Sequence, residues 1–210
     1  MDFLQIFIDG IFRGDLVGMV KAVGYIGLFG IVFAETGLFL GFFFPGDSLL
    51  FVAGFLSAGG FFSLPFLIFG LFLSAVLGNM LGYAFGKRIG PKIFSKEDSF
   101  IFKKSHVLKA QHFYEKYGPK MIFLARFMPI VRTFAPIVAG VANMKYTTFF
   151  FYNVIGAFVW TVLLTLLGYF LGNVIDVDKY LLPIILIIII LSFLPAITAY
   201  IREKHRAQKH

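Results

Sequence analysis

Long uncharged stretches dominate the hydrophobic pattern of this chain. Residues 61–86, 146–175 and 180–201 contain no Asp, Glu, Lys or Arg. Since about 20 apolar residues cross a bilayer as a helix, each stretch predicts one transmembrane helix. The composition agrees, because 59% of the 210 residues are hydrophobic and only 14% are charged, which leaves more apolar surface than one soluble core can bury. The sequence therefore predicts an all-α integral membrane protein.

Two further apolar segments are interrupted by glycine, proline and charge. Residues 37–47 hold three glycines and a proline and end on a carboxylate, and residues 121–144 contain two prolines and two arginines. An unbroken helix through either segment would lose backbone hydrogen bonds at membrane depth. Two re-entrant hairpins are therefore expected. The residues expected to shape them are Pro45, Gly46, Pro129, Pro136 and Gly140.

A pattern of small residues occurs twice along the chain. In the first copy, Val-Ala-Gly ends at Gly54 and Gly-Tyr-x-x-Gly begins at Gly82. In the second copy, the same motifs end at Gly140 and begin at Gly168, so 28 residues separate the two motifs in both copies. This spacing indicates an internal repeat. The alternative is chance, because small residues are common in membrane helices.

The basic residues predict the orientation of the chain. Residues 87–120 carry nine Lys or Arg against three Asp or Glu, and the C-terminal tail is also basic, so both are expected in the cytoplasm. The two Gly-Tyr-x-x-Gly motifs then lie at opposite membrane faces, which makes the repeat inverted and the two hairpins opposed, as in secondary transporters. The orientation of the N-terminal segment stays open. The net charge of +8 fits contact with anionic lipid rather than with nucleic acid.

The chain is expected to form a single membrane domain over residues 1–210. Its predicted parts are repeat one at about 24–90, a cytoplasmic basic loop with an interfacial helix at 87–120, repeat two at about 117–175, and a C-terminal transmembrane helix at 180–201. The interfacial helix is expected because apolar side chains form one stripe along the basic loop and the charged side chains lie largely off it.

Four ionisable residues lie within the apolar segments: Glu35, Asp47, Arg126 and Arg132. A charge that faces lipid costs ~2.5–3.5 kcal/mol or more, so such residues are usually retained for a function. The alternative is a structural ion-pair network that holds the hairpins together. All four histidines lie in the basic loop or the tail, and the chain has no cysteine, so no metal site and no cofactor are expected.

The longest motif is F-x-x-R-F-x-P-x-x-R-x-x-x-P-x-x-A-G at residues 123–140. Together with Phe33-Ala34-Glu35, Pro45-Gly46-Asp47, Asn153 and Trp160, it resembles the DedA family, also called the SNARE-associated or VTT domain family. The resemblance implies a bacterial inner-membrane protein with two opposed re-entrant hairpins. For several members it implies translocation of undecaprenyl phosphate, the lipid carrier of cell-wall synthesis.

Other members of the family are linked to maintenance of the proton-motive force and to drug tolerance, and eukaryotic relatives scramble phospholipids. The family's two acidic and two arginine positions fall on Glu35, Asp47, Arg126 and Arg132. The chemistry of these residues is compatible with a phosphate site. A guanidinium stays charged and binds two phosphate oxygens through parallel hydrogen bonds, so both arginines are expected to bind a lipid headgroup. The two carboxylates are expected to hold the arginines when the site is empty and to couple transport to protons.

The predicted function is a flippase for a lipid phosphate, with undecaprenyl phosphate as the expected substrate and membrane lipids and protons as the expected partners. Asn79 and Asn153 are expected to join helices, and Trp160 to anchor their packing. An enzyme is not expected, because no His or Cys lies at membrane depth to supply a nucleophile or a general base. Three alternatives stay open: an uncoupled phospholipid scramblase, a proton-dependent drug or ion antiporter, and a non-transporting membrane scaffold.

Overall fold

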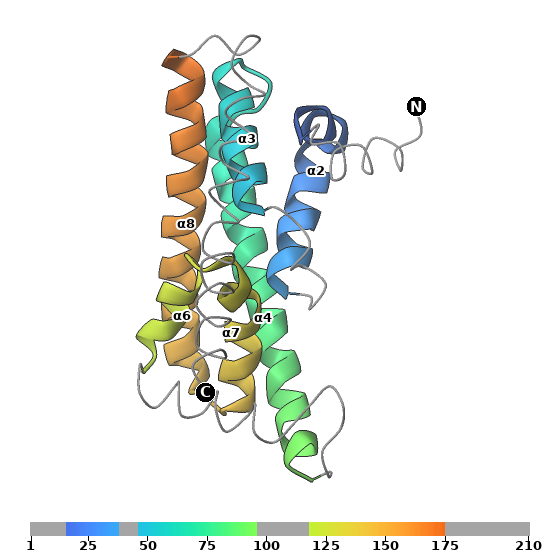
Figure 1. The fold of residues 1–210 in the computed structure, drawn as a ribbon, viewed down its shortest axis with the longest axis vertical. Helices are drawn as coiled ribbons and strands as arrows, with labels where there is room; N and C mark the ends of the chain where they lie inside the picture. The colour runs from blue at the N-terminus through green and yellow to red at the C-terminus, as the bar shows by residue number, and fades with distance from the viewer. Residues whose placement is uncertain (1–15, 38–45, 96–117, 175–210) are drawn as a thin grey trace, which may run out of the picture. The chain divides into compact units, whose positions relative to one another are not determined.

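The computed structural model describes residues 16–37, 46–95 and 118–174 (Figure 1). These residues form six α-helices and no strand, which confirms the all-α prediction for the described part of the chain. The helices are α2 (Leu16–Gly37), α3 (Gly46–Ala58), α4 (Leu64–Ser95), α6 (Lys120–Ala125), α7 (Pro129–Val141) and α8 (Tyr146–Val174).

Three of the described helices are long and apolar enough to cross a membrane: Val20–Gly37, Leu64–Arg88 and Tyr146–Val174. The second and third confirm the spans expected at 61–86 and 146–175, whereas the span expected at 180–201 lies outside the described residues. One boundary differs, because α4 continues to Ser95, well past the last residue of the uncharged stretch. Lys and Arg are good helix formers, so the end of an apolar stretch does not have to end the helix.

Internal contacts divide the chain into two compact units. The first comprises Met1–Val23, Pro45–Leu64 and Leu164–His210, and the second comprises Gly24–Phe44 and Pro65–Leu163. One of the boundaries falls inside α2 at Gly24, whose φ of 57° and ψ of −159° interrupt the helix. Glycine tolerates this left-handed φ because it has no Cβ.

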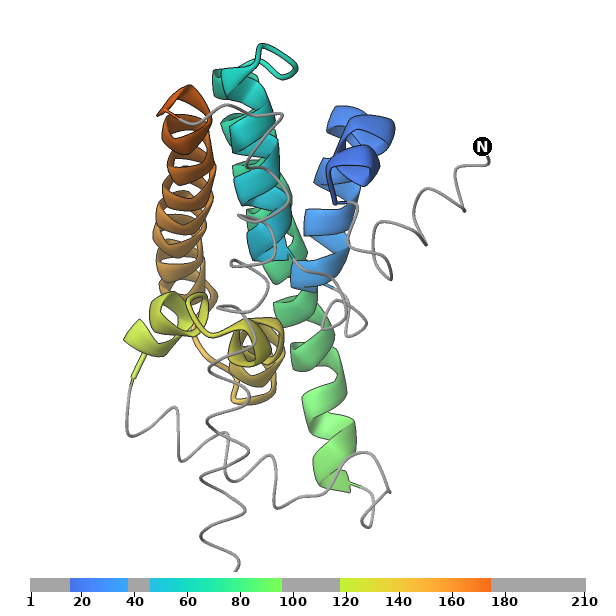
Figure 2. The same cartoon turned by 45° about the horizontal axis from the view of Figure 1, so that its top comes forward.

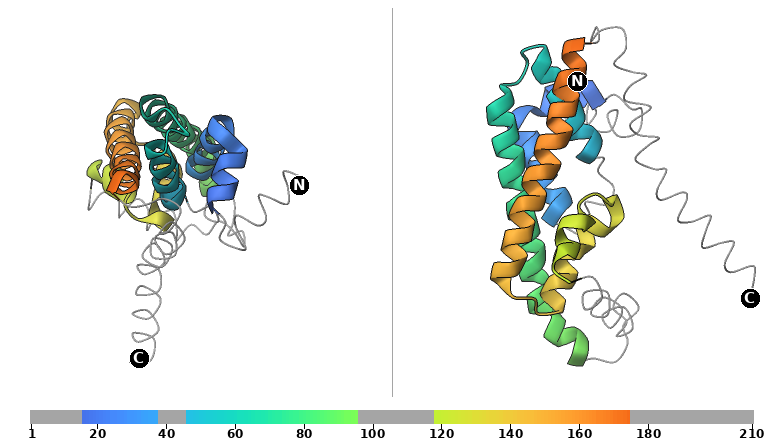
Figure 3. Two further views of the ribbon diagram at one scale, coloured as in Figure 1. Left: turned by 90° about the horizontal axis from the view of Figure 1, so that it is seen from above. Right: turned by 90° about the vertical axis from the view of Figure 1, so that its left-hand side faces the viewer.

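Glycines bring the helices of the second unit close together. Gly78, Gly82 and Gly86 recur every fourth residue on α4 and so lie along one face of that helix. A methyl group added at Gly78 would overlap Thr36 of α2, and one added at Gly86 would overlap the carbonyl oxygen of Ile137 in α7. These backbones therefore pack as small-residue interfaces do in membrane proteins. The views of Figure 3 place α4 beside the first half of α8, and Nδ2 of Asn153 in α8 donates a hydrogen bond to the carbonyl oxygen of Val76 in α4 at 3.1 Å.

The first unit contains a matching contact between α3 and the second half of α8. A methyl group added at Gly54 would overlap the carbonyl oxygen of Thr165, and one added at Gly168 would overlap that of Phe51. In the second unit, a methyl group at Gly140 of α7 would likewise overlap the carbonyl oxygen of Tyr83 in α4. In both units the glycine of Val-Ala-Gly thus packs against the helix that carries Gly-Tyr-x-x-Gly of the other copy.

The segment 121–144 is broken once, between α6 and α7. Figure 2 shows these as two short helices joined by a turn, and the turn comprises residues 126–128. Met128, with φ −118° and ψ 104°, is extended, and Pro129 is the first residue of α7. A residue before proline is pushed out of the helical region, and a proline fits well at the first helical position, so the sequence explains both the break and the restart.

One of the residues expected to shape the hairpins behaves differently. Pro136 was expected to lie at a second break, but α7 continues through it. Its ring packs on Gly82, since a Cβ at that glycine would lie 3.4 Å from Cβ of Pro136, and this packing offsets the single helical hydrogen bond that proline cannot donate. In the first hairpin, Gly46 begins α3, and Pro45 lies outside the described residues.

We expect Gly86→Ala to destabilise the protein by ~1–3 kcal/mol, because the new methyl group meets backbone that cannot move aside as a flexible side chain would. Gly30→Ala in α2 is the matched control, since nothing lies within 4 Å of a Cβ at that position. The measurement is the thermal unfolding midpoint of each purified variant in the same detergent. Equal midpoints for the two variants would contradict the close packing of α4 on α7.

Candidate functional site

Arg126 lies in the turn after α6 and is 2% exposed. Its Nη2 donates a hydrogen bond to Oδ1 of Asn153 in α8 at 2.6 Å and a longer one to the carbonyl oxygen of Ala75 in α4 at 3.4 Å. Asn153 is fully buried, and its Nδ2 donates to the carbonyl oxygen of Val76 at 3.1 Å. The amide of Asn153 is thus fixed by α4 with its oxygen toward the arginine.

Asn79 of α4 adds a second amide oxygen to the same arginine. In the orientation that places donors against acceptors, Asn79 Oδ1 accepts from Arg126 Nη2 at 2.8 Å and Nδ2 donates to the carbonyl oxygen of Thr36 at 3.1 Å. The opposite orientation would put the amide nitrogen against the guanidinium, with donors on both sides, so the hydrogen-bond network selects the first. Among the described residues, Arg126 therefore contacts neutral oxygens and no carboxylate.

Arg132 has a different partner. It lies in α7, is 5% exposed, and donates a hydrogen bond from Nη2 to Oε1 of Glu35, which is 1% exposed near the C-terminal end of α2. The ion pair joins α2 to α7 across 97 residues of sequence. A carboxylate was expected to hold an arginine, and the pair of Glu35 with Arg132 has this geometry.

Trp160 of α8 lies beside both guanidinium groups. The ring centroid is 4.7 Å from Cζ of Arg132 and 6.0 Å from Cζ of Arg126, and the indole is 2% exposed. Cations at these distances are attracted to the face of an indole ring. Trp160 thus contributes to the electrostatics of the site as well as to helix packing.

Asp47 belongs to the first unit, where it lies half-buried in the first turn of α3. A carboxylate is favoured at a helix N-terminus by the exposed N–H groups there. Within the second unit, the buried ionisable side chains at the site are Glu35, Arg126 and Arg132.

The side chain of Arg126 packs closely against Gly156 of α8. A Cβ added at Gly156 of α8 would lie 3.0 Å from Cδ and 3.3 Å from Nε of Arg126. Nε itself has no hydrogen-bond partner among the described residues. The arrangement can therefore accept an anion, because it holds a buried cation with a donor that has no partner among the described residues. The described residues contain no group of three or more His, Cys, Asp or Glu that could hold a metal.

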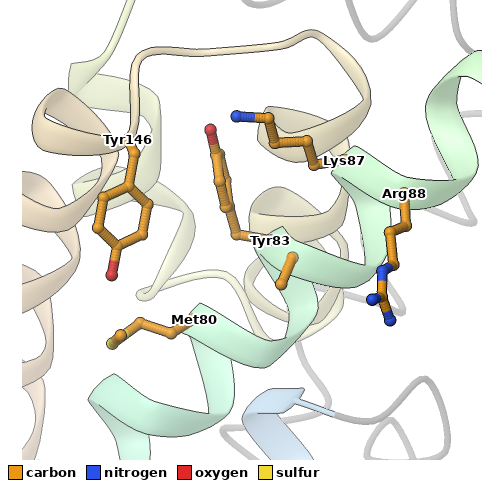
Figure 4. A pocket seen from close by; sticks show the side chains of 6 residues that line it. Met80, Tyr83, Lys87, Arg88 and Tyr146 are labelled. Atoms are coloured by element: carbon orange, nitrogen blue, oxygen red, sulfur yellow. The ribbon is translucent and has the colours of Figure 1, made fainter.

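A separate cavity of about 450 Å³ lies at the charged end of the α4 span (Figure 4). Met80, Tyr83, Ala84 and Tyr146 provide most of its lining, and Lys87 and Arg88 also border it. Tyr83 is fixed there by a 2.5 Å hydrogen bond from its hydroxyl to the carbonyl oxygen of Met144. The lining includes none of the buried ionisable residues of the site.

Sequence reasoning assigned Asn79, Asn153 and Trp160 to helix packing and so missed their contacts with the arginines. The available signal was their periodicity, because Asn153, Gly156 and Trp160 are three and seven residues apart and share one face of α8. A polar residue, a glycine and an indole on one face of an apolar helix indicate contact with a polar group in the neighbouring helices.

These features define a helical membrane protein with ionisable side chains buried among its apolar helices. Residues 44–170 match the VTT domain family. Protein DedA of Escherichia coli K12 is 43% identical over 216 aligned residues, which cover 100% of the chain and 99% of that protein. The uncharacterized membrane protein Rv0364 of Mycobacterium tuberculosis H37Rv is 44% identical, with 93% of the chain and 90% of that protein covered.

Inner membrane protein YqjA of E. coli K12 is 32% identical, with 83% of the chain and 81% of that protein covered. The chain therefore belongs to the DedA family of membrane proteins, which confirms the resemblance drawn from its motifs. No solved structure matches the chain.

Proposed function

We propose that the protein is a transporter that moves a lipid phosphate, undecaprenyl phosphate, across the bacterial inner membrane. The observation that carries the proposal is the pair of buried arginines, of which Arg132 is paired with Glu35 and Arg126 with neutral oxygens. Burying a cation without a counter-ion is costly, and an anionic substrate would supply the missing charge.

Arginine suits this role for geometric reasons. Its planar guanidinium offers several donors in a fixed arrangement and binds two oxygens of one phosphate at once. In an environment with little water such contacts are stronger than at a surface, because the charges are poorly screened. Arg126 and Arg132 are therefore proposed to bind the headgroup, while the prenyl chain stays among apolar side chains and lipid.

Glu35 is proposed to control access to Arg132. A phosphate that binds Arg132 has to displace Glu35, and protonating the displaced carboxylate removes its repulsion from the bound anion. Substrate binding would then take up a proton. Asp47 is proposed as a second coupling carboxylate, and a gradient that is acidic outside would favour loading from that face and inward return of the carrier lipid.

The proposed architecture is an inverted repeat with two opposed re-entrant hairpins. The break between α6 and α7 supports the second hairpin, since α7 is too short to cross the bilayer as a helix. The reciprocal packing of the repeated glycines on the helix of the other copy, found in both units, supports the repeat. The basic residues 87–120 and the C-terminus are proposed to lie in the cytoplasm.

This architecture predicts which faces of the membrane single cysteines will label from, and the chain has no native cysteine to interfere. Cysteines at Lys21 and Gly59, which flank the first hairpin, should react with an impermeant maleimide from the outside. Cysteines at Lys120 and Lys145, which flank the second hairpin, should react only after the inner face is exposed. Labelling of the two flanks of either hairpin from opposite faces would contradict re-entry of that hairpin. For the first hairpin, this result would make α2 a full span.

The proposed substrate can be tested by binding to the purified protein. Undecaprenyl phosphate should raise the thermal unfolding midpoint as its concentration increases, because a ligand that binds only the folded state stabilises it. Undecaprenol, which has the same tail without the phosphate, is the matched control and should have little effect. Equal stabilisation by both would assign the effect to the tail, and equal stabilisation by phosphatidylglycerol would favour a general phospholipid scramblase.

A further inference from the structure

The two buried arginines are held in chemically different ways. Arg132 pairs with a carboxylate, Glu35, whereas the hydrogen bonds of Arg126 within the described residues go to amide and carbonyl oxygens. The difference matters because a buried cation is usually compensated by an opposite charge. An amide oxygen satisfies an N–H donor and fixes its direction, but it leaves the full positive charge of the guanidinium in place.

We propose that Asn79 and Asn153 are positioning residues that keep Arg126 oriented without neutralising its charge. Arg126 is then the residue of the site that can bind an anion at all times. Arg132 can bind an anion only after Glu35 has been displaced from it. This inference rests on the proposed function and adds an order of events to it. The phosphate meets Arg126 first and then competes with Glu35 for Arg132.

The geometry of the two amides supports this division. The oxygens of Asn79 and Asn153 lie 2.8 and 2.6 Å from the same atom, Arg126 Nη2, which also makes the longer hydrogen bond to the carbonyl oxygen of Ala75 at 3.4 Å. Each amide is itself fixed by its nitrogen, Asn79 on the carbonyl oxygen of Thr36 and Asn153 on that of Val76. The backbones of α2 and α4 therefore determine where the guanidinium points. The hydrogen bonds described for Arg126 come from Nη2, and Nε has no hydrogen-bond partner among the described residues, so Nε stays available to an anion.

The sharpest test is Asn153→Asp, which keeps the shape of the side chain and replaces the neutral oxygen at Arg126 with a carboxylate. Purified protein should remain folded, because the new charge pairs with Arg126 and offsets the lost hydrogen bond from Nδ2 of Asn153 to the carbonyl oxygen of Val76. Its affinity for undecaprenyl phosphate should fall at least about tenfold, since the new carboxylate neutralises the charge of Arg126. Asn79→Asp should behave in the same way and serves as the second variant if the first fails to fold.

Asn173→Asp is the matched control, because Asn173 is an exposed asparagine on the same helix. Its Nδ2 donates a hydrogen bond to the carbonyl oxygen of Tyr169, one turn earlier in α8. It should bind like wild type. Asn153→Ala removes both hydrogen bonds of the amide, so it should lower both the unfolding midpoint and the affinity.

The outcomes distinguish this inference from the function on which it rests. If wild-type protein does not bind undecaprenyl phosphate in preference to undecaprenol, the proposed function fails. If wild type binds and folded Asn153→Asp binds equally well, the function stands and the positioning role of the amides is overturned. A loss of affinity in folded Asn153→Asp supports the inference, since the substitution changes the charge beside Arg126 while it keeps the shape of the side chain.

Discussion

Arg126→Lys is expected to weaken binding of undecaprenyl phosphate by about 10- to 100-fold, although the substitution conserves the charge. The ammonium of lysine is a compact point charge with three donors and no planar fork. It cannot satisfy the oxygens of Asn79 and Asn153 and also bind two phosphate oxygens. Transport should fall with binding, and Arg126→Ala should be worse because it removes the cation altogether. Binding isotherms and flux on the same preparations provide the measurement.

Arg88→Lys is the matched control for this substitution, because Arg88 is an exposed arginine on α4. It should leave affinity and flux unchanged. Arg132→Lys should also impair binding, but it should additionally disturb the pair with Glu35. A folded Arg126→Lys variant with wild-type affinity and wild-type flux would exclude direct phosphate binding by this residue.

The second large effect is expected from Glu35→Gln, which mimics the protonated acid and removes the charge that occupies Arg132. In wild type, affinity for the lipid phosphate should rise as the pH falls, because protonation of Glu35 releases Arg132. The variant should bind at least as tightly as wild type and with a much weaker pH dependence. It should also fail to accumulate substrate in response to a proton gradient.

Asp47→Asn tests the other proposed coupling residue, which lies in the first turn of α3. The comparison is accumulation of labelled lipid in proteoliposomes with and without an imposed pH difference. If Glu35→Gln responds to the gradient as wild type does, the carboxylate does not couple transport to protons. Its pair with Arg132 would then be a structural contact.

Sequence alone predicted the long spans because a run of more than 20 uncharged residues has one stable solution in a bilayer. It placed the end of α4 too early, since hydropathy reports where the membrane ends and not where the helix ends. It predicted a break in the segment that contains Pro129, because an unbroken helix through its prolines would lose backbone hydrogen bonds at membrane depth. It was wrong about Pro136, because the cost of one missing hydrogen bond was offset by packing on Gly82, which depends on the tertiary structure.

The candidate site shows the same limit. Charge in an apolar segment is a strong signal, and it singled out four residues: Glu35, Asp47, Arg126 and Arg132. The partner of each charge could not be predicted, because it depends on how closely α2, α4 and α7 approach at their glycines. Neutral side chains such as Asn153 give no comparable signal, so their contact with Arg126 emerged only from the structure.

If the protein moves a lipid phosphate through a site built on buried arginines, movement of the lipid should depend on Arg126. The most direct measurement is the transfer of labelled undecaprenyl phosphate between the leaflets of proteoliposomes that contain wild-type protein, the Arg126→Ala variant or no protein. The account predicts transfer with wild type well above the protein-free rate, and transfer with folded Arg126→Ala close to that rate. Wild-type transfer no faster than in protein-free liposomes, or equal transfer by folded Arg126→Ala, would contradict it.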